Sequence, residues 1–256
     1  QFYKGDRPAA SIPSIFTYWA CKFLTPRMIE MFGTNSIEEF YALEIKRIIG
    51  TNKSVNILSL GSGEASSEIL ILKHLHDHGI EACMTCTDIS PLMSNAGKTN
   101  AEDAGLSKYM EFRTLDINRQ FPEVDATFVI ANHSLHHFVE LEFIFENIQR
   151  QIEANGAFIV SDMIGRNGHM RWPEVLGFTK AFWNLLPSEK RIDRTHGIHR
   201  PEFIDWDCAN GTFEGIRAQD ILPLCVEMFS FDRFLGFGGV QDTFIDRMYG
   251  ANFSSV

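Results

Sequence analysis

The stretch VNILSLGSGEASSEI, residues 55–69, decides the fold of this chain. Its first six residues are mostly apolar and predict a buried strand, and a helix is predicted from about residue 65 to residue 78. The glycine turn between them, Gly61-Ser62-Gly63, is of the kind that brings backbone N–H groups close to a ligand. A tight turn with no ligand gives the same pattern, so the rest of the chain must decide between them.

Strands and helices alternate on the C-terminal side of this stretch. Further strands are predicted at residues 82–87, 109–113, 126–131 and 157–161, with helices starting at Ser90-Pro91 and spanning about 139–154. This alternation predicts an α/β fold with a doubly wound, mostly parallel sheet. Such a sheet binds its ligands at the carboxyl ends of its strands.

The flanking segments predict four parts. Residues 1–50 form an N-terminal helical segment or lid, in which Ser36 and Glu39 make a capping box and Gly50 ends the helix. Residues 51–165 are the cofactor-binding core, and residues 166–217 form a cap insert after the fifth strand. Residues 218–256 return to the core sheet through a helix, a strand near 229–235 and a helix near 243–249.

The composition excludes several classes of protein. The chain has 256 residues, 45% of them apolar, with 23 basic and 33 acidic side chains and a formal charge of −10. This acidic balance argues against a nucleic-acid partner, and no apolar run is long enough for membrane insertion. The five cysteines are typical of reduced thiols in a cytoplasmic protein. The start at Gln1 rather than Met, and the end at Val256 soon after a predicted helix, predict a piece of a longer protein.

Acidic residues follow the second and third predicted strands. Asp88 ends the second, where a carboxylate can accept both hydroxyls of a ribose, and Asp116 follows the third, where it can accept a hydrogen bond from an adenine amino group. Ile89 and Ile117 stand beside these acids and could sandwich the adenine. The polar loop ANHSLHHF, residues 131–138, follows the fourth strand, where the methionine part of a sulfonium cofactor would lie.

With this ordered set, roughly residues 50–165 resemble the class I S-adenosylmethionine-dependent methyltransferases. The resemblance implies S-adenosylmethionine as the cofactor and S-adenosylhomocysteine as its product. It also implies that Gly61, Ser62 and Gly63 line the methionine and the ribose and that Asp88 binds the ribose. Asp116 with Ile117 would bind the adenine and Asn132 the methionine end, with His133 as a further cofactor-binding residue. Three features depart from the family. Ser59 stands at the end of the first strand, where an acid is usual, and Ala65 replaces the third glycine of the turn. Asp88 lies more than the usual roughly 20 residues after the turn, because the first helix is long.

Later segments resemble a bacterial subgroup of these enzymes that is associated with sugar, polysaccharide or small-molecule modification. They are SDMIGRNGHMRWPE (161–174), GIRAQDILPL (215–224) and FGGVQDTFIDRMYGANF (237–253). This resemblance implies a small-molecule or saccharide acceptor. Neither the acceptor itself nor the oligomeric state follows from it.

Methyl transfer needs chiefly the alignment of nucleophile, methyl group and sulfur. A hydroxyl acceptor would also profit from a base, for which histidine is suited. We expect His136 to be this base and His169 to be the alternative, although a packing role explains these histidines equally well. In the cap, Arg166 and Arg171 could hold an anionic group. Further side chains could close over the substrate or the cofactor: Trp172, Trp183, Tyr18, Trp19 and Lys22.

No metal site is expected. His74, His76 and His78 lie at a helix end, which favours histidine, and no carboxylate or cysteine accompanies them at metal spacing. Two other functions stay open. A nicotinamide-dependent dehydrogenase is disfavoured, because Ser66 replaces the last glycine of G-x-G-x-x-G. The other is a non-catalytic subunit or sensor that binds S-adenosylmethionine.

Overall fold

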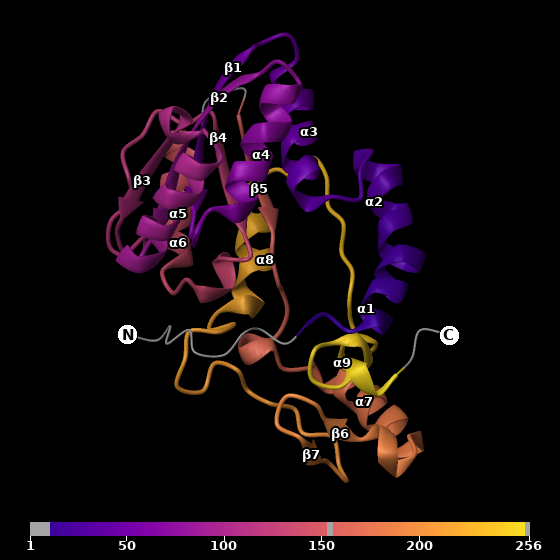
Figure 1. Ribbon diagram of the computed structural model, residues 1–256. Helices are drawn as coiled ribbons and strands as arrows, with labels where there is room; N and C mark the ends of the chain where they lie inside the picture. The colour runs from indigo at the N-terminus through magenta and orange to yellow at the C-terminus, as the bar shows by residue number, and fades with distance from the viewer. Residues whose placement is uncertain (1–10, 153–155, 254–256) are drawn as a thin grey trace.

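A five-stranded parallel sheet forms the centre of the computed structural model, which describes residues 11–152 and 156–253. The strand order is β3-β2-β1-β4-β5 (Figure 1). The predicted doubly wound α/β fold is therefore confirmed. The strands are β1 (Ser54–Leu60), β2 (Glu81–Asp88), β3 (Met110–Thr114), β4 (Phe128–Asn132) and β5 (Ala157–Ser161).

Helices cover both faces of the sheet. Side chains alternate along each strand, so that Ile57 and Ile130 pack on one face while Leu58 and Val129 pack on the other. The first face is covered by α3 (Ile37–Ile49), α4 (Ser66–Asp77) and α5 (Pro91–Asp103), and the second by α6 (Leu141–Gln151) and α8 (Ala218–Met228). Because helices bury both faces of the sheet, a ligand can reach the sheet only at the ends of its strands.

Local signals in the sequence set several helix ends. The Ser36 hydroxyl accepts a hydrogen bond from the Glu39 amide at the start of α3, and Ser90 accepts one from the Met93 amide at the start of α5. Gly50 follows the last residue of α3 with a φ of +59°. The predicted end of the α6 helix, near residue 154, lies outside the described residues.

The N-terminal segment consists of α1 (Ser14–Trp19), a π-helical stretch (Ala20–Leu24) and α2 (Thr25–Phe32). It runs alongside the molecule, away from the sheet (Figure 1). The Trp19 ring lies 6.4 Å from that of Phe237, and Lys22 donates a hydrogen bond to the Tyr18 hydroxyl. The closing of this segment over the cofactor stays a prediction.

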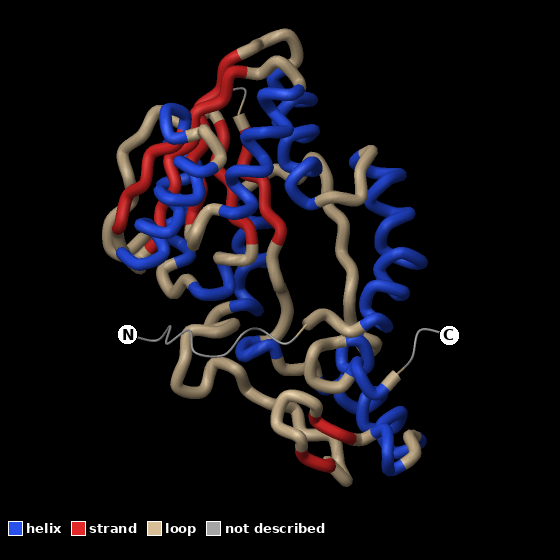
Figure 2. The backbone as a smooth tube through the Cα atoms, viewed as in Figure 1, coloured by secondary structure: helices blue, strands red, loops and turns tan. Residues whose placement is uncertain are grey.

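Many of the residues after β5, though not those of α8, build a second, lower lobe (Figures 1 and 2). Its core is Trp183, Phe203 and Tyr249, all buried. Trp183 therefore packs inside the lobe, whereas Trp172 is exposed. The elements of the lobe are η4 (Asn167–His169), α7 (Pro173–Leu185), η5 (Ser188–Lys190), the hairpin β6 (Ile192–Asp193) and β7 (Ile198–His199), α9 (Asp242–Ile245) and η6 (Gly250–Asn252).

The strand predicted near residues 229–235 is wrong. These residues form no strand, and the helix predicted at 243–249 is the short α9. Phe229 instead packs its ring against Phe145 and Phe158 over the sheet. Arg233 then donates to the Met31 carbonyl at 2.7 Å, which ties the segment to the end of α2. Phe229 is thus partly buried by side-chain packing without strand pairing, while Phe231 and Phe234 are exposed.

None of the helices in the described part of the chain combines the length and the apolar character that crossing a membrane requires.

Candidate functional site

The turn after β1 lies against the loop after β4. Gly61 has a φ of +70°, and a Cβ atom at this position would lie 2.7 Å from the Ser134 Cβ. The Ser134 hydroxyl donates to the Leu60 carbonyl at 2.6 Å, which holds the loop against the turn. The turn therefore requires glycine, both for its backbone conformation and for space. It lies between β1 and β4, the point of the sheet at which doubly wound folds bind ligands.

Asp88, the last residue of β2, is hydrogen-bonded to the same turn. Its Oδ2 accepts a hydrogen bond from the Gly63 amide at 2.9 Å, and its Oδ1 accepts one from the Ser90 amide at 2.7 Å. The Ser62 amide donates to the Thr87 carbonyl at 2.9 Å. These contacts bring the glycine turn and the predicted ribose-binding acid together at the carboxyl ends of neighbouring strands.

The residues expected around the adenine differ in exposure. Ile89 is 66% exposed, whereas Ile117 is 6% exposed and packs in the core below the sheet edge. Asp116 accepts hydrogen bonds from the backbone and side-chain nitrogens of Asn118 and pairs with Arg119. Asp116 is thus held at the site edge, and the sandwich of the adenine between the two isoleucines stays a prediction.

Asn132 ends β4 with an unused acceptor. Its Oδ1 is buried and accepts no hydrogen bond from any described residue. A buried acceptor without a donor is costly, so this atom suits a ligand that brings a donor, such as the amino group of a methionine moiety. His133 follows with a φ of +54°, its amide donates to the Ser161 carbonyl, and burial lowers the pKa of its imidazole.

His136 is a buried imidazole between two carboxylates. Its Nδ1 donates to Asp162 Oδ1 at 2.5 Å, and its Nε2 lies 3.5 Å from Glu214 Oε1. Asp162 is held in turn by the amides of Ser134 and Leu135. Burial lowers the pKa of His136, but the two carboxylates outweigh it and raise the pKa from 6.5 to about 9. With this raised pKa the ring keeps its proton at neutral pH, whereas the base expected from the sequence would have a pKa near neutral pH.

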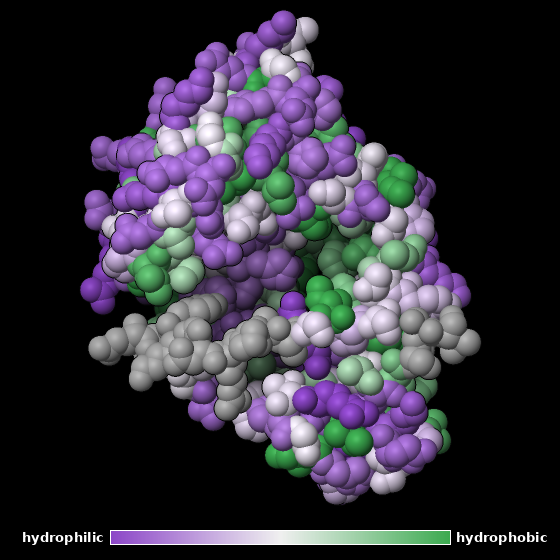
Figure 3. All heavy atoms as spheres, viewed as in Figure 1, coloured by the Kyte–Doolittle hydropathy of each residue, from purple (hydrophilic) through white to green (hydrophobic). Residues whose placement is uncertain are grey.

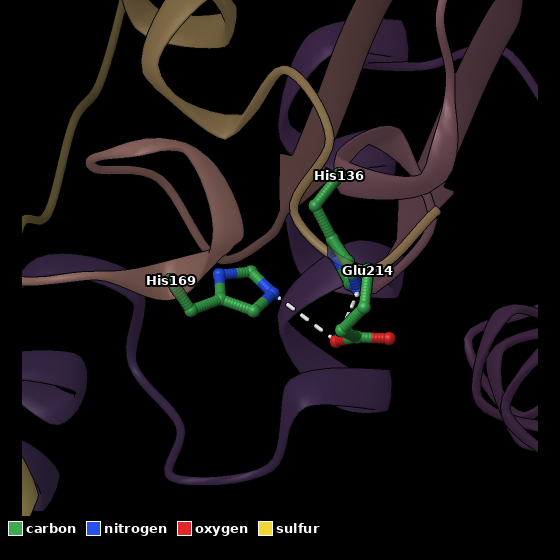
Figure 4. A group of neighbouring side chains, drawn as sticks. All are labelled: His136, His169 and Glu214. Carbon is green, nitrogen blue, oxygen red and sulfur yellow. Dashed lines mark hydrogen bonds and ion pairs between the residues drawn. The ribbon is translucent and has the colours of Figure 1, made fainter. Parts of the chain in front are cut away.

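Glu214 connects the two predicted catalytic histidines. The same oxygen, Oε1, lies 3.1 Å from His169 Nε2 and 3.5 Å from His136 Nε2, and Figure 4 shows both contacts meeting at it. His137 Nδ1 lies 3.7 Å from the other oxygen of Glu214. The imidazoles of His136 and His169 keep the pKa of the Glu214 carboxyl well below its usual range. The structure therefore places His136 and His169 in one cluster.

The backbone fixes this cluster. The Gly168 amide donates to the Gly215 carbonyl at 2.8 Å, and the Ile216 amide donates to the His136 carbonyl at 3.2 Å. His169 has a φ of +54°, an uncommon conformation for a residue with a side chain. The loop that carries Glu214 is therefore hydrogen-bonded to both loops that carry the histidines.

Sequence reasoning missed Asp162 and Glu214. Asp162 directly follows β5, and an acid at a strand end was the signal used for Asp88, so it could have been found. Glu214 lies in the cap, 45 residues after His169 and 78 residues after His136, and no local pattern marks it. Contacts of that kind depend on the tertiary fold.

A buried acid also lies beside Ser59. The Ser59 hydroxyl donates to Glu68 Oε1 at 2.8 Å, and Glu68 in the first turn of α4 is 3% exposed. Burial raises the pKa of Glu68 to about 7. The acid that the family usually has at the end of its first strand is thus absent from β1, but a carboxyl group approaches the same strand from the helix.

The arginines expected to bind an anion have protein partners. The Arg171 guanidinium lies 3.6 Å from Asp205 and over the ring of Phe203, and Arg166 donates to the Arg171 carbonyl. Elsewhere in the cap, His196 pairs with Asp193 at 2.8 Å. Anion binding by the two arginines stays a prediction.

A family model matches the central part of the chain. Residues 58–160 match a family model described as a methyltransferase domain. Together with the confirmed fold, this match supports a methyltransferase that uses S-adenosylmethionine as its cofactor. A nicotinamide-dependent function gains no support from this match.

Similar proteins include two curated fungal enzymes. The chain is 24% identical over 187 residues to trichosetin synthetase PKS-NRPS1 of Gibberella fujikuroi, an alignment that covers 71% of this chain and 5% of that protein. It is 24% identical over 164 residues to 5-methylorsellinic acid synthase of Aspergillus terreus, covering 62% of this chain and 6% of that one. The chain thus spans about one-twentieth of the length of these relatives.

A solved structure is similar over a shorter part. The S-adenosylmethionine-dependent methyltransferase from Geobacter sulfurreducens, in complex with S-adenosyl-L-homocysteine, is 19% identical. The alignment covers 49% of this chain and 47% of that one, with a TM-score of 0.37.

The residues at the strand ends fit this cofactor. The turn at Gly61 leaves no room for a side chain, Asp88 has carboxylate oxygens at the turn, and the buried Asn132 Oδ1 lacks a donor. The face shown in Figure 3 is hollowed between the sheet and the lower lobe. The individual cofactor contacts remain those predicted from the sequence.

Proposed function

We propose that this chain transfers a methyl group from S-adenosylmethionine to a small-molecule acceptor without the help of a metal, and that His136 takes the acceptor's proton. The observation that carries the proposal is the imidazole–carboxylate pair of His136 and Asp162 at the ends of β4 and β5. His136 lies in the same loop as Asn132, whose buried oxygen suits the methionine end of the cofactor.

Bound S-adenosylmethionine supplies an electrophilic methyl group, and the remaining work belongs to the protein. We assign the ribose to Asp88 and the glycine turn, the adenine to Asp116 with Ile89 and Ile117, and the methionine end to Asn132 and His133. Asp162 orients the His136 ring through Nδ1, and Nε2 becomes able to receive a proton when an entering acceptor displaces Glu214 and so removes one of the two carboxylates that raise the pKa of the ring. Glu214 lies beside Nε2 and stabilises the resulting imidazolium ion.

The acceptor reaches this site through the lower lobe. Glu214 and His169 both belong to the segment after β5 predicted to be a cap, and the Glu214 side chain is 40% exposed while that of His136 is 4% exposed. Glu214 therefore shields His136 Nε2, and an acceptor displaces or hydrogen-bonds this carboxylate as it enters. On this basis the cap selects the acceptor.

The preferred acceptor is the hydroxyl group, or the amine, of a sugar or another small molecule, as the resemblance to the bacterial subgroup suggests. A second candidate is an activated carbon atom in a polyketide. It is favoured by the names of the curated relatives, which include a PKS-NRPS synthetase and 5-methylorsellinic acid synthase. Both candidates have a proton to lose, so the same base serves either.

Two experiments test the proposal. Calorimetric titration with S-adenosylmethionine, S-adenosylhomocysteine and NAD should give micromolar binding of the first two alone, weakened at least about tenfold by Asp88→Ala. Turnover with methyl-¹³C-labelled cofactor then distinguishes a new O-methyl, N-methyl or C-methyl group by its carbon chemical shift. Tight cofactor binding without turnover on any acceptor would favour the non-catalytic subunit.

The role of His136 is tested with His136→Asn, which keeps a side-chain N–H near Asp162 and removes Nε2. We expect kcat to fall about 100-fold or more while cofactor binding is kept. His169→Ala is the matched variant and should lower kcat less. If both variants keep full turnover, the proton-transfer role is wrong.

A further inference from the structure

The cluster of His136, His169 and Glu214 has the donor set of a transition-metal site. Their nearest donor atoms lie within 4.8 Å of one another, with Glu214 Oε1 at 3.1 Å from His169 Nε2 and at 3.5 Å from His136 Nε2. In a tetrahedral zinc site with bonds of about 2.0–2.1 Å, neighbouring ligand atoms are about 3.4 Å apart. An ion can therefore sit between these atoms after only small side-chain movements.

The surroundings of His136 match those of a metal-bound histidine. A metal-ligating imidazole almost always donates its other N–H to a carboxylate or a carbonyl, which fixes the tautomer and the ring orientation. Here Nδ1 donates to Asp162, whose side chain is 1% exposed and is itself held by the Ser134 and Leu135 amides. The ring therefore presents Nε2 to Glu214 and His169 in the tautomer that an ion requires.

The three ligands lie on backbone segments that are already joined. Gly168, next to His169, donates to the carbonyl of Gly215, next to Glu214. A Cβ atom on Gly215 would lie 3.0 Å from the His169 ring, so these loops approach closely at this point. Because the loops need little further ordering, the entropy cost of assembling the ligands around an ion is small.

We propose that His136 Nε2, His169 Nε2 and one Glu214 oxygen bind a divalent transition-metal ion of the Zn²⁺ type, and that the bound ion inhibits methyl transfer. Two imidazoles and one carboxylate select Zn²⁺, Co²⁺ or Fe²⁺ over Mg²⁺ and Ca²⁺, which prefer oxygen. The inhibition follows because the ion occupies the ring nitrogen that the proposed function uses for the proton. That second part rests on the proposed function, whereas the binding does not.

Binding is measured first, on the whole chain without cofactor or acceptor. Titration with Co²⁺ should give one ion per chain and the intense visible bands of a four- or five-coordinate site, and Zn²⁺ should displace it. Glu214→Gln and His169→Ala should each weaken Zn²⁺ binding at least about 100-fold, and Asp162→Asn about 10- to 100-fold. His196→Ala, in the separate Asp193–His196 pair, should leave the affinity unchanged.

Several outcomes would overturn the binding claim. They are the absence of saturable 1:1 binding, the weak bands of a six-coordinate ion on surface histidines, and Zn²⁺ affinity that survives Glu214→Gln. Glu214 lies on a partly exposed loop, and its variant should keep the wild-type thermal transition in the absence of metal. If that variant fails to fold, the cobalt spectrum of the wild-type chain still decides.

Inhibition is measured second, with any acceptor that the wild-type enzyme methylates. Stoichiometric Zn²⁺ should lower the rate at least about tenfold, and a chelator should restore it. A rate that is unchanged or increased at full occupancy would overturn the inhibitory role while the binding claim stands. A chain that binds zinc but methylates nothing in the absence of metal contradicts the proposed function and leaves the site in place.

Discussion

Gly61 has a φ of +70° and faces Ser134 across the switch point of the sheet. We predict that Gly61→Ala lowers the free energy of unfolding by more than about 2 kcal/mol, because the left-handed backbone alone costs about 1–2 kcal/mol and the new Cβ meets Ser134 at 2.7 Å. Cofactor affinity should fall as well. Denaturant titration and calorimetry measure the two effects.

Gly79→Ala is the matched control, since Gly79 has a φ of +73° and no atom of the described residues lies within 4 Å of the added Cβ. This variant should lower the free energy of unfolding only by the cost of the left-handed backbone conformation, and it should leave cofactor binding intact. Equal losses in both variants would mean that the contact with Ser134 contributes nothing.

Asp162 is the second residue whose replacement is informative. Asp162→Asn retains the size of the side chain but weakens the acceptor for His136 Nδ1, Ser134 and Leu135. We expect kcat to fall about 100-fold with a smaller change in the KM for the cofactor, as measured by steady-state kinetics. A variant that changes only KM would assign Asp162 to binding alone.

At the scale of the elements, Glu68 in α4 makes stability depend on pH. Burial raises the pKa of this carboxyl from 4.5 to about 7, so the folded chain binds more protons than the unfolded chain between these values. The stability that Glu68 contributes is therefore present below pH 4.5 and is lost as the pH rises through 7.

Glu68→Gln should stabilise the protein at pH 8 by about 1–3 kcal/mol relative to the wild type and have little effect at pH 4.5. The glutamine oxygen still accepts the hydrogen bond from Ser59. Urea titrations at the two pH values measure the difference, with exposed Glu64→Gln as the control for charge alone. A stability difference that does not change with pH would show that Glu68 ionises normally.

Individual elements were predictable where their signals are local. The strands of the sheet, the caps at Ser36 and Ser90 and the turn at Gly61 each follow from neighbouring residues. The structure of segment 229–235 was not predictable, because its aromatic residues are typical of a strand, whereas Phe229 packs on Phe145 and Phe158 without strand pairing. Whether such a run pairs with a strand depends on which edge of the sheet is free, and sequence spacing does not contain that information.

The residues of the site were likewise predictable where a local signal, the end of a strand, marks them. The expected cofactor residues of β1, β2 and β4 follow strand ends, and the structure brings Gly63 and Asp88 into contact. His136 and His169 were expected as alternatives, yet they lie in one cluster joined by Glu214. The contacts of Glu214 with these histidines join residues that lie far apart in the sequence, and a local sequence pattern does not predict such contacts.

For the molecule as a whole, Trp183 holds the lower lobe together. It is fully buried, with the rings of Phe203 and Tyr249 at 5.6 and 4.8 Å. Trp183→Ala should cost about 3–5 kcal/mol in the lobe. Hydrogen exchange should therefore quicken in α7 and α9 well before it does in β1 and β4.

Trp183→Phe is the milder variant. It keeps an aromatic ring and removes the buried Nε1, which has no hydrogen-bond partner among the described residues. It should lose less stability than the alanine variant. Uniform exchange in both lobes of the alanine variant would show instead that the chain unfolds as one cooperative unit.

Glu214 has a consequence for the engineering and evolution of this enzyme. A segment that merely covered the strand ends could be replaced by that of another enzyme to obtain a new substrate range. Here the replaceable piece also carries Glu214 and His169, which contact His136 in the loop after β4. Under the proposed function, a chimera that exchanges residues 166–217 would lose part of its reaction chemistry along with its selectivity, unless the donor segment supplies an acid and a histidine at the same places.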